Sequence, residues 1–549
     1  MSVLRPRQKL GTHEVFNQTP PLGDLDLWAT DPALREAVSR EGEAVHEQRV
    51  HDFARLCGSE SMQEHAFRAN RWLPELKSFD RYGRRIDEVD FHPSYHALMQ
   101  VGLDGGVSSV AWSEATSGHV LHSALFYLMA ELEPSVCCPM SMTYAAVPAL
   151  QATPSVAERW IPPILASRYD SRSRPAAEKR GVTVGMAMTE KQGGSDVRGN
   201  TTRATRDGDG YRLYGHKWFC SAPMSDAFLT LAYSEEGLTC FLVPRWTPDG
   251  ERNPFHIMRL KDKLGDRANA SSEIEYHDTW ATIVGPPGRG ISTIIAMVHH
   301  TRLDCAIAPA AFMHRTILEA FHHARHRSAF GKRLVESELM EKVLADLVLE
   351  SEATTALTFR LARAFDEAER GDERARSFAR IATPVAKYWH NKRVVPTVHE
   401  AMEVHGGAGF VEESLMPRYY RQAPLNGIWE GSGNVMCLDV LRAASREPEA
   451  ITILREELQS TRGEDPDYDE HLRAWLPRLE PSRLDQSSAR SLVEALGLAL
   501  QANVLLASGA SEIAHAFCRT RIGASRAVSF GAYTGELPIR VLMERVPEL

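Results

Sequence analysis

VTVGMAMTEKQGGSD, residues 182–196, marks the point at which the hydrophobic pattern of this 549-residue chain changes its period. Before it, from about residue 36, apolar residues recur at intervals of three and four, as in 73–76 and 144–150, which predicts helices. Prolines at 134, 139, 148, 154, 162 and 163 are expected to separate these helices. After it come short segments rich in Val, Thr, Tyr and Phe, which predict strands. We therefore expect a β domain to follow a helical one.

The β domain is predicted for residues 182–285. A hairpin signal supports it, because Asp207-Gly208 and Asp209-Gly210 stand between two of the strand-like segments. The predicted strands are VTVGMAM (182–188), TTRATR (201–206), YRLYG (211–215), AFLTLAY (227–233), LTCFLV (238–243) and SSEIEYH (271–277).

Helical spacing returns after the linker Gly285–Gly290. Segments 291–330, 337–370 and 374–405 are long enough for the helices of a bundle. A polar, acidic stretch follows residue 446, and helical spacing resumes over 487–518. The predicted fold is α+β and mostly α. It comprises an N-terminal arm (1–35), an N-terminal helical domain (36–181), a small β-barrel (182–285), a C-terminal helical bundle (291–445) and a helical C-terminal extension (446–549).

The composition is that of a globular protein, with 43% hydrophobic and 25% charged residues and a formal net charge of -9. An acidic balance argues against a sequence-blind nucleic-acid coat. The eight cysteines are scattered without a CxxC pair, which predicts reduced thiols in a cytoplasmic protein. No apolar run follows the basic residues of the first 16, so we expect no signal peptide. Residues 492–506 are interrupted by polar side chains and predict a buried helix, with no membrane partner.

Two segments of the β domain carry candidate cofactor contacts. In the loop 188–196, glycines allow close approach of a ligand, and Thr189 and Ser195 offer hydroxyl groups. Further on, Phe219 precedes Ser221 by two residues, so an aromatic ring can lie over a flat cofactor while the hydroxyl binds its edge. Taken alone, the first segment is equally typical of a surface loop, and the second is more typical of an ordinary core aromatic.

The strongest candidate for catalysis is Glu430, in the segment Ile428-Trp429-Glu430-Gly431-Ser432-Gly433-Asn434. A carboxylate between an aromatic ring and glycines, at the start of a helix, is well placed to abstract a proton. Burial against Trp429 would raise its pKa. The alternative is a glutamate that only interacts with the helix dipole. The turn 403–410, with its Gly406-Gly407 pair, predicts a helix C-cap when read alone.

Together and in this order, these segments resemble the acyl-CoA dehydrogenase family. The matching motifs are MTEKQGGSD, FCS, EVHGGAGF and WEGS. Two more agree: KLGDR (263–267), and RSAFG (327–331), whose counterpart in the family reaches the FAD of a neighbouring subunit. The resemblance spans about 90–445 and implies an FAD-dependent oxidoreductase acting on CH–CH groups.

The resemblance also implies roles for individual residues. Glu430 would remove a proton alpha to a thioester carbonyl while hydride passes to the flavin, and Arg442 would pair with a carboxylate near the site. No metal is expected, and His322 and His326 are predicted to lie on a solvated helix face. His299 stands where many members have Asp near the CoA. The implied FAD contacts are Met186, Met188, Thr189, Gln192, Gly194, Ser195, Phe219, Cys220, Ser221, Arg327, Phe330, His405, Gly406, Gly407, Ile428, Trp429, Gly431, Ser432 and Asn434.

Details of the motifs, the arm with HEVFNQTPPL and the long C-terminal region resemble the AidB branch of the family, flavoproteins of the bacterial alkylation response. This implies a homotetramer and an acyl-CoA or related small molecule. It also implies double-stranded DNA as a partner of the C-terminal region. That region is not strongly basic in composition, but Arg519, Arg521 and Arg526 cluster in the sequence, with Arg540 and Arg545 following, and this pattern permits a basic face in the folded protein. A helical oligomerisation domain is the alternative role of that region.

Three functional hypotheses follow. The first is an AidB-type flavoprotein that protects DNA from alkylating agents and has weak acyl-CoA dehydrogenase activity. The second is a fully active acyl-CoA dehydrogenase that uses Glu430 on an unusual, branched or bulky acyl-CoA. The third is a DNA-binding protein in which the flavin is purely structural.

Overall fold

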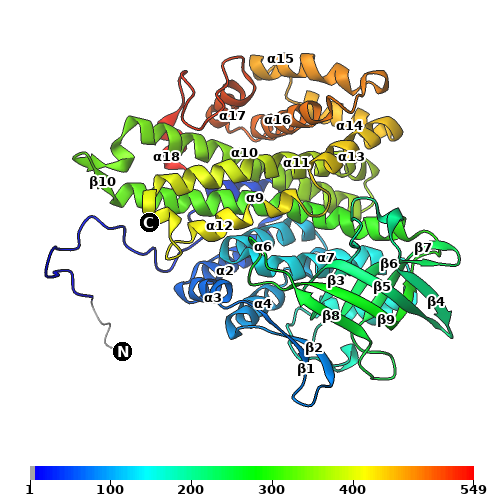
Figure 1. Cartoon of the computed structure of the whole chain (residues 1–549). Helices are drawn as coiled ribbons and strands as arrows, with labels where there is room; N and C mark the ends of the chain where they lie inside the picture. Colours follow the sequence, from blue (N-terminus) through cyan, green and yellow to red (C-terminus); the bar gives the residue numbers. More distant parts are fainter. Residues whose placement is uncertain (1–5, 549) are drawn as a thin grey trace.

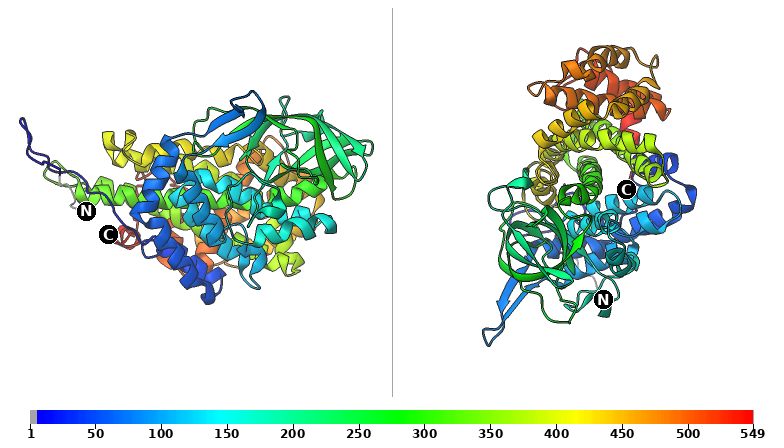
Figure 2. Two further views of the ribbon diagram at one scale, coloured as in Figure 1. Left: turned by 90° about the horizontal axis from the view of Figure 1, so that it is seen from below. Right: turned by 90° about the vertical axis from the view of Figure 1, so that its right-hand side faces the viewer.

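The computed structural model describes residues 6–548 (Figure 1). An N-terminal helical layer packs on one side of three long central helices, a β-barrel lies at one end, and the C-terminal extension covers the opposite side (Figure 2). The N-terminal helices are α1 (Pro32–Glu41), α2 (Glu47–Gly58), α3 (Glu60–Arg71), α4 (Pro93–Gly105), α5 (Val110–Ser113), α6 (Gly118–Leu132), α7 (Cys137–Leu150) and α8 (Pro154–Leu165).

The N-terminal region differs from the prediction in three respects. Helix α1 begins at Pro32, inside the predicted arm, because Asp31 caps its first turn by accepting from the Leu34 N–H. Leu76 belongs to a hairpin, β1 (Glu75–Phe79) and β2 (Arg85–Asp90), and not to a helix. Several prolines lie within α7 and α8 rather than between helices. Pro139 and Pro154 stand in first turns, where the N–H has no intrahelical partner to lose. Pro148, Pro162 and Pro163 stand in last turns, where each one removes a donor to the carbonyl four residues earlier close to the point where the helix ends.

The middle domain is a sheet that closes on itself, as the sequence predicts. The order β3-β6-β4-β5-β9-β7 is completed by pairing of β6 with β7. The predicted hairpin is present, with Asp207 opposite Gly210. One strand, β8, escaped prediction because His256 and Arg259 interrupt its apolar pattern. The strands are β3 (Val184–Ala187), β4 (Arg203–Asp207), β5 (Gly210–Ser221), β6 (Ala227–Ser234), β7 (Gly237–Pro244), β8 (Phe255–Leu260) and β9 (Ser271–Val284).

The three long helices of the bundle begin and end within four residues of the predicted limits. They are α9 (Gly290–His326), α10 (Glu338–Glu369) and α11 (Glu373–Val404). Helix α9 ends before residue 330 because the chain enters a small hairpin, β10 (Ser328–Ala329) and β11 (Lys332–Arg333). Two shorter helices, α12 (Met416–Gln422) and α13 (Gly433–Arg446), complete the bundle.

The acidic part of the C-terminal extension also forms helices, with a turn at 460–465 between the first two. Its helices are α14 (Pro448–Gln459), α15 (Pro466–Trp475), α16 (Ala489–Ala507), α17 (Ser511–Phe517) and α18 (Ile539–Glu544). Helix α16 is long and apolar enough to cross a membrane, yet 83% of its apolar window is buried inside the protein. Its Gln501 accepts a hydrogen bond from the Trp389 indole of α11 at 2.8 Å. This confirms the prediction of a buried helix.

Two of the five arginines expected on a basic face point inward instead. Arg521 donates to Asp346 at 2.6 Å and to Glu350 at 2.9 Å, both on α10. Arg545 donates to carboxylates of α1 and α10. The basic face that the sequence suggests is therefore reduced to Arg519, Arg526 and Arg540.

Candidate active site

Glu430 lies on a tight turn between a 3-10 turn (Leu425–Gly427) and α13. Its φ of +57° is left-handed, as is that of Gly431 at +97°. A left-handed glutamate costs of order 1–3 kcal/mol and persists only where neighbouring structure enforces it. Lys387 of α11 enforces it here by donating to the carbonyls of Asn426 at 2.9 Å, Trp429 at 2.9 Å and Gly431 at 2.7 Å. One buried ammonium group thus fixes the turn on both sides of Glu430.

Helix α9 holds the Glu430 carboxylate and backbone through two consecutive residues. Thr301 Oγ1 donates to the carboxylate Oε2 at 2.7 Å, and Arg302 Nε donates to the Glu430 carbonyl at 3.1 Å. Arg302 also binds Asp439 of α13 at 2.8 Å. Burial is the largest influence on the pKa of Glu430 and raises it, against the opposing effects of Thr301, Lys387 and Arg302. The arrangement is that of an oriented carboxylate base.

Arg442, which the sequence suggested as a catalytic partner, lies away from this carboxylate. Its side chain is exposed, and it reaches only Asp439, at 3.9 Å. Because Asp439 already binds Arg302 and Arg380, Arg442 adds at most a peripheral charge. Thr301, Arg302 and Lys387 occupy the supporting positions, and no local motif in the sequence marks them.

The loop 188–196 is organised by a buried ion pair between Glu190 and Lys217 at 2.8 Å. The Glu190 carboxylate also accepts hydrogen bonds from the backbone N–H of Thr201, from the backbone N–H of Thr202 and from the side-chain amide of Gln192. Burial raises the pKa of Glu190, but Lys217 and these donors outweigh it and lower the pKa to about 2. Glu190 therefore has a structural role, and the predicted FAD contact Gln192 uses its side-chain amide to hold the loop.

Replacing Glu190 with Gln is expected to lower the free energy of unfolding by about 3–5 kcal/mol, because Lys217 is left as a buried charge without a counterion. Urea unfolding at pH 7 measures the change. Glu275→Gln, on an exposed position of β9, is the matched control and should shift stability by less than about 0.5 kcal/mol.

The pH dependence of the same variant provides a second check. The pKa of Glu190 is lower in the folded protein than in the unfolded chain, so the ionised carboxylate stabilises the fold at pH values above the ordinary pKa of glutamate. This stabilisation is lost as the pH falls toward 2 and the carboxylate is protonated in the folded protein. The difference in stability between the Glu190→Gln variant and the wild type should therefore shrink with acidification below about pH 4.5. A constant difference over that range would contradict the assignment.

The side chains of β5 alternate between two environments. Phe219 is 51% exposed, whereas Cys220 is fully buried. The period of two along a strand turns the Cys220 side chain into the barrel core, so the predicted contact of Cys220 with FAD stays a prediction for its backbone alone. Phe219 and Ser221 lie on the other face. Ser221 hydrogen bonds Ser271 at 3.0 Å, which keeps its hydroxyl at the barrel rim.

The barrel and the Glu430 turn meet in one apolar cluster. Met186 is a buried member of this cluster, and Met188 and Trp429 pack against it. Ile428, next to Trp429, is 65% exposed. Gly194 lies so close to Thr189 that a Cβ atom at this position would be 2.3 Å from the Thr189 hydroxyl oxygen. The exposed rings and chains of Phe219 and Ile428, with the hydroxyl groups of Thr189 and Ser221, are of the kinds that contact the flat faces and polar edge of a cofactor such as FAD.

The remaining predicted contacts divide between two places. Gly431, Ser432 and Asn434 stand on or beside the Glu430 turn, and Ser195 lies on the exposed loop of the barrel. Arg327, Phe330, His405, Gly406 and Gly407 lie instead where α9 and α11 end, at the β10 end of the bundle. In Figure 1 that end is opposite the barrel. A single chain therefore does not bring all the predicted FAD contacts together.

Of the two histidines predicted on a solvated face, His322 is buried, so the prediction was wrong for this residue, whereas His326 is exposed as predicted. His322 is buried and donates to the Pro20 carbonyl at 2.8 Å, and His326 donates to the His322 carbonyl at 2.9 Å. The N-terminal arm supplies the cover. His299, where a CoA contact was in question, stacks on Phe365 with ring centroids 4.7 Å apart.

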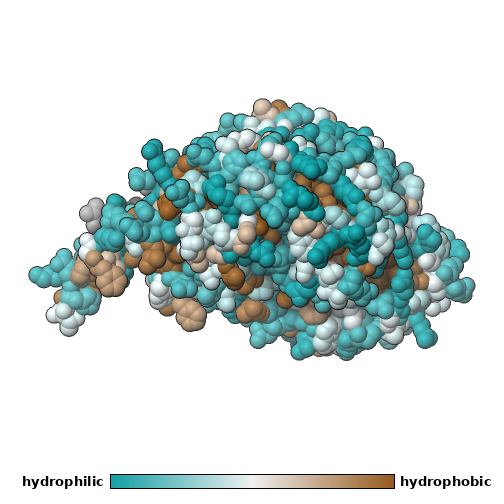
Figure 3. Space-filling model, turned by 90° about the horizontal axis from the view of Figure 1, so that it is seen from above, coloured by the Kyte–Doolittle hydropathy of each residue, from teal (hydrophilic) through white to brown (hydrophobic). Residues whose placement is uncertain are grey.

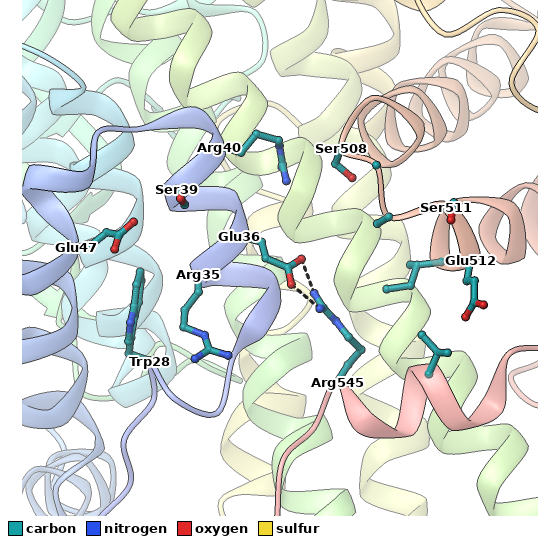
Figure 4. Close-up of a pocket in the computed structure, with 14 residues that line it drawn as sticks. Trp28, Arg35, Glu36, Ser39, Arg40, Glu47, Ser508, Ser511, Glu512 and Arg545 are labelled. Carbon is teal, nitrogen blue, oxygen red and sulfur yellow. Dashed lines mark hydrogen bonds and ion pairs between the residues drawn. The ribbon is translucent and has the colours of Figure 1, made fainter.

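A separate cavity of about 850 Å³ lies between α1 and the C-terminal extension (Figure 4). Arg35, Arg40 and Ser511 line it, and Arg545 crosses it to bind Glu36. In the described part of the chain, residues 6–548, none of the predicted FAD contacts lines this cavity. It is therefore separate from the predicted flavin site.

The comparison with known families agrees with this arrangement. Residues 288–445 match the C-terminal domain of acyl-CoA dehydrogenases, residues 185–279 match the middle domain, and residues 17–171 match the N-terminal domain of the adaptive response protein AidB. The chain belongs to the acyl-CoA dehydrogenase family, whose members are FAD-dependent oxidoreductases acting on CH–CH groups.

Within the family the chain is of the AidB type. It is 47% identical to the putative acyl-CoA dehydrogenase AidB of Escherichia coli, over 84% of this chain and 86% of that protein. It is 32% identical to acyl-CoA dehydrogenase family member 11 of Caenorhabditis elegans, over 82% of this chain and 75% of that protein. The crystal structure of C. elegans ACDH-11 with C11-CoA superimposes with a TM-score of 0.83 at 26% identity, over 94% of each chain.

Proposed function

We propose that this protein dehydrogenates an acyl-CoA, with Glu430 as the base that removes the α-proton of the acyl group. The observation that carries the proposal is the partly buried Glu430 carboxylate on a left-handed turn fixed by Thr301, Arg302 and Lys387. Such fixation reduces the cost of orienting the base during reaction. FAD, when bound, supplies the acceptor for the hydride from the β-carbon. Met188, Thr189, Phe219 and Ile428 would hold it.

The proton is transferred to the Glu430 carboxylate, whose pKa is raised by burial and which is therefore a stronger base than a solvated glutamate. Thr301 donates to Oε2, which leaves Oε1 for the substrate. The Glu430 N–H is expected to donate to the thioester carbonyl and so to stabilise the developing enolate. The structure of a C. elegans relative with C11-CoA supports acyl-CoA as the substrate class.

Anaerobic mixing with acyl-CoAs tests this proposal. The yellow holoprotein is mixed with linear, branched and aromatic acyl-CoAs, and loss of flavin absorbance is followed. Rapid bleaching by one of them supports a fully active dehydrogenase with an unusual substrate. Slow bleaching by all of them supports the AidB-type hypothesis of weak activity. A correctly folded, colourless protein that cannot be reconstituted with FAD would overturn both.

We also propose a homotetramer in the cytoplasm. The oligomer is supported by the separation of the predicted FAD contacts into two groups, since the group containing Arg327 and His405 could then act on the flavin of another copy. The cytoplasm is supported by the cysteines, which are all buried and unpaired.

A second proposed function is protection of DNA against alkylation, with duplex DNA bound by the C-terminal extension. Its support is the match of residues 17–171 to the adaptive response protein and the outward position of Arg526 and Arg540. Affinity for a random duplex should fall steeply with salt, and the double variant Arg526→Ala/Arg540→Ala should lower the slope of log K against log salt by about 2. Absence of binding at low salt would contradict this function and would leave a helical oligomerisation role for the extension.

A further inference from the structure

Three ionisable side chains lie together in the core of the helical region. Asp31 caps the start of α1, Glu131 belongs to α6 and His314 to α9, and all three are between 0% and 6% exposed. Ionisable groups ordinarily lie at the surface, and the face over the C-terminal extension is accordingly mostly hydrophilic (Figure 3). One metal-binding atom from each of the three residues lies within 4.8 Å of the other two. None of the three belongs to the proposed flavin site.

His314 presents one ring nitrogen, Nδ1, to both carboxylates. This atom is hydrogen bonded to Glu131 Oε1 and lies 3.4 Å from Asp31 Oδ2. The other ring nitrogen, Nε2, lies 3.3 Å from the Thr30 carbonyl, which can only accept, so Nε2 carries a proton. In a neutral imidazole Nδ1 is then the nitrogen with a free lone pair, and it faces the two carboxylates.

The two carboxylates are oriented by the protein and are not fully hydrogen bonded. Asp31 Oδ2 accepts from the Tyr127 hydroxyl of α6 at 2.7 Å. Glu131 Oε2 is buried and has no hydrogen-bond partner among the residues that the structure describes. It lies at the cluster, because it belongs to the same carboxylate as Oε1. Arg315 of α9 makes its ion pair with Glu319 instead, at 2.8 Å. A buried acceptor without a partner is costly and calls for an explanation.

One imidazole nitrogen and two carboxylate oxygens form a donor set that suits Zn²⁺, since imidazole favours zinc over magnesium and calcium. Zinc binds such atoms at about 2.0–2.2 Å, which places two tetrahedral ligands about 3.3–3.6 Å apart. The 3.4 Å between His314 Nδ1 and Asp31 Oδ2 meets this spacing. The contacts of His314 with Thr30 and of Asp31 with Tyr127 are of the kind that orient metal ligands. A divalent ion would also neutralise the two buried carboxylates.

We propose that Asp31, Glu131 and His314 bind a zinc ion that joins the start of α1 to α6 and α9. The ion takes the place of the proton between Nδ1 and the carboxylates, which is released to solvent, and Glu131 contributes its free Oε2. Its role is structural, because the three ligands are buried and lie on three separate segments of the fold. The sequence predicts no metal because these ligands lie far apart along the chain. The proposal is independent of the flavin and of Glu430.

The zinc content of the protein tests the proposal. Full-length protein, produced with Zn²⁺ in the medium and purified without a metal-binding tag or chelator, should contain about one zinc ion per chain by plasma mass spectrometry. Asp31→Asn should lower this content at least about tenfold. Asparagine caps a helix about as well as aspartate, so this variant is expected to fold.

Glu133→Gln is the matched control for the loss of a buried carboxylate. Glu133 is also fully buried, just after the end of α6, but it pairs with Arg418 at 3.1 Å and lies outside the cluster. This variant should retain its zinc. Equal zinc contents in Asp31→Asn and the wild type would overturn the proposal. So would a wild-type content below about 0.1 ions per chain, and a proton on His314 would then hold the two carboxylates together.

Thermal unfolding of the wild type gives a measurement that does not depend on a variant. Protein from zinc-supplemented medium should have a thermal midpoint at least about 3 °C above that of protein from zinc-depleted medium, because an ion that binds only the folded chain stabilises it. Asp31→Asn should show no such difference. Identical wild-type midpoints, with zinc present in one sample and absent from the other, would contradict a structural ion.

Discussion

Replacing Glu430 with Gln is expected to slow flavin reduction by acyl-CoA by at least about 10³-fold, while FAD remains bound. Glutamine has the same shape, and its amide oxygen can still accept from Thr301 at the position where the carboxylate accepts at 2.7 Å. The Lys387 bonds to neighbouring carbonyls are also unaffected. The variant therefore removes the proton acceptor and little else. Stopped-flow absorbance with the best acyl-CoA of the panel measures the effect.

The pH profile of the wild type sharpens this prediction. The base acts only when deprotonated, and burial raises the pKa of Glu430 above its ordinary value of 4.5. The rate of flavin reduction should therefore rise with pH through a pKa above 4.5 and then level off. Glu413→Gln, a change on an exposed position of the preceding loop, should retain both rate and profile. Reduction of the Glu430→Gln flavin at the wild-type rate would refute its role as base.

Replacing Lys387 with Met is expected to lower the free energy of unfolding by about 3 kcal/mol, since three buried carbonyl groups lose their donor at about 1 kcal/mol or more each. The left-handed turn at Glu430 then loses its main support. Flavin reduction should slow even where the protein is folded, because the carboxylate is no longer held in place. Urea unfolding and single-turnover reduction measure the two effects.

Lys392→Met is the control for this change, because Lys392 lies on the same helix and is exposed. It should alter stability by no more than about 0.5 kcal/mol. If Lys387→Met has an unchanged urea midpoint and an unchanged reduction rate, the three hydrogen bonds do not hold the turn, and another cause must be found for the conformation of Glu430.

The sequence predicts the barrel well because β-branched and aromatic residues concentrate between 182 and 285. It misses the β1–β2 hairpin, since Leu73 and Leu76 also match helical spacing. The helices α14 and α15 were not predicted individually, because their acidic residues hide short apolar faces. Such segments acquire their structure from packing against the bundle, which a local pattern does not record.

Glu430, the proposed base, could be identified because its aromatic and glycine neighbours, together with the other motifs in order along the chain, resemble those of the family. Its supporting residues could not. Thr301 is 129 positions away, and Lys387 is one of two lysines on a long helix. Only tertiary structure shows that both reach the same turn. The buried side chain of Cys220, in contrast, could have been foreseen from strand alternation alone.

The ion pair between Glu36 and Arg545 joins positions 509 residues apart. During synthesis at 5–20 residues per second, roughly 25–100 s pass between the appearance of the first partner and that of the second. Until then helix α1 must hold its place on the growing chain without this ion pair, through its apolar contacts and through polar contacts such as that of Tyr127 with Asp31. The contact between α1 and the residues just after α18 is therefore completed only after all the helices between them have been synthesised.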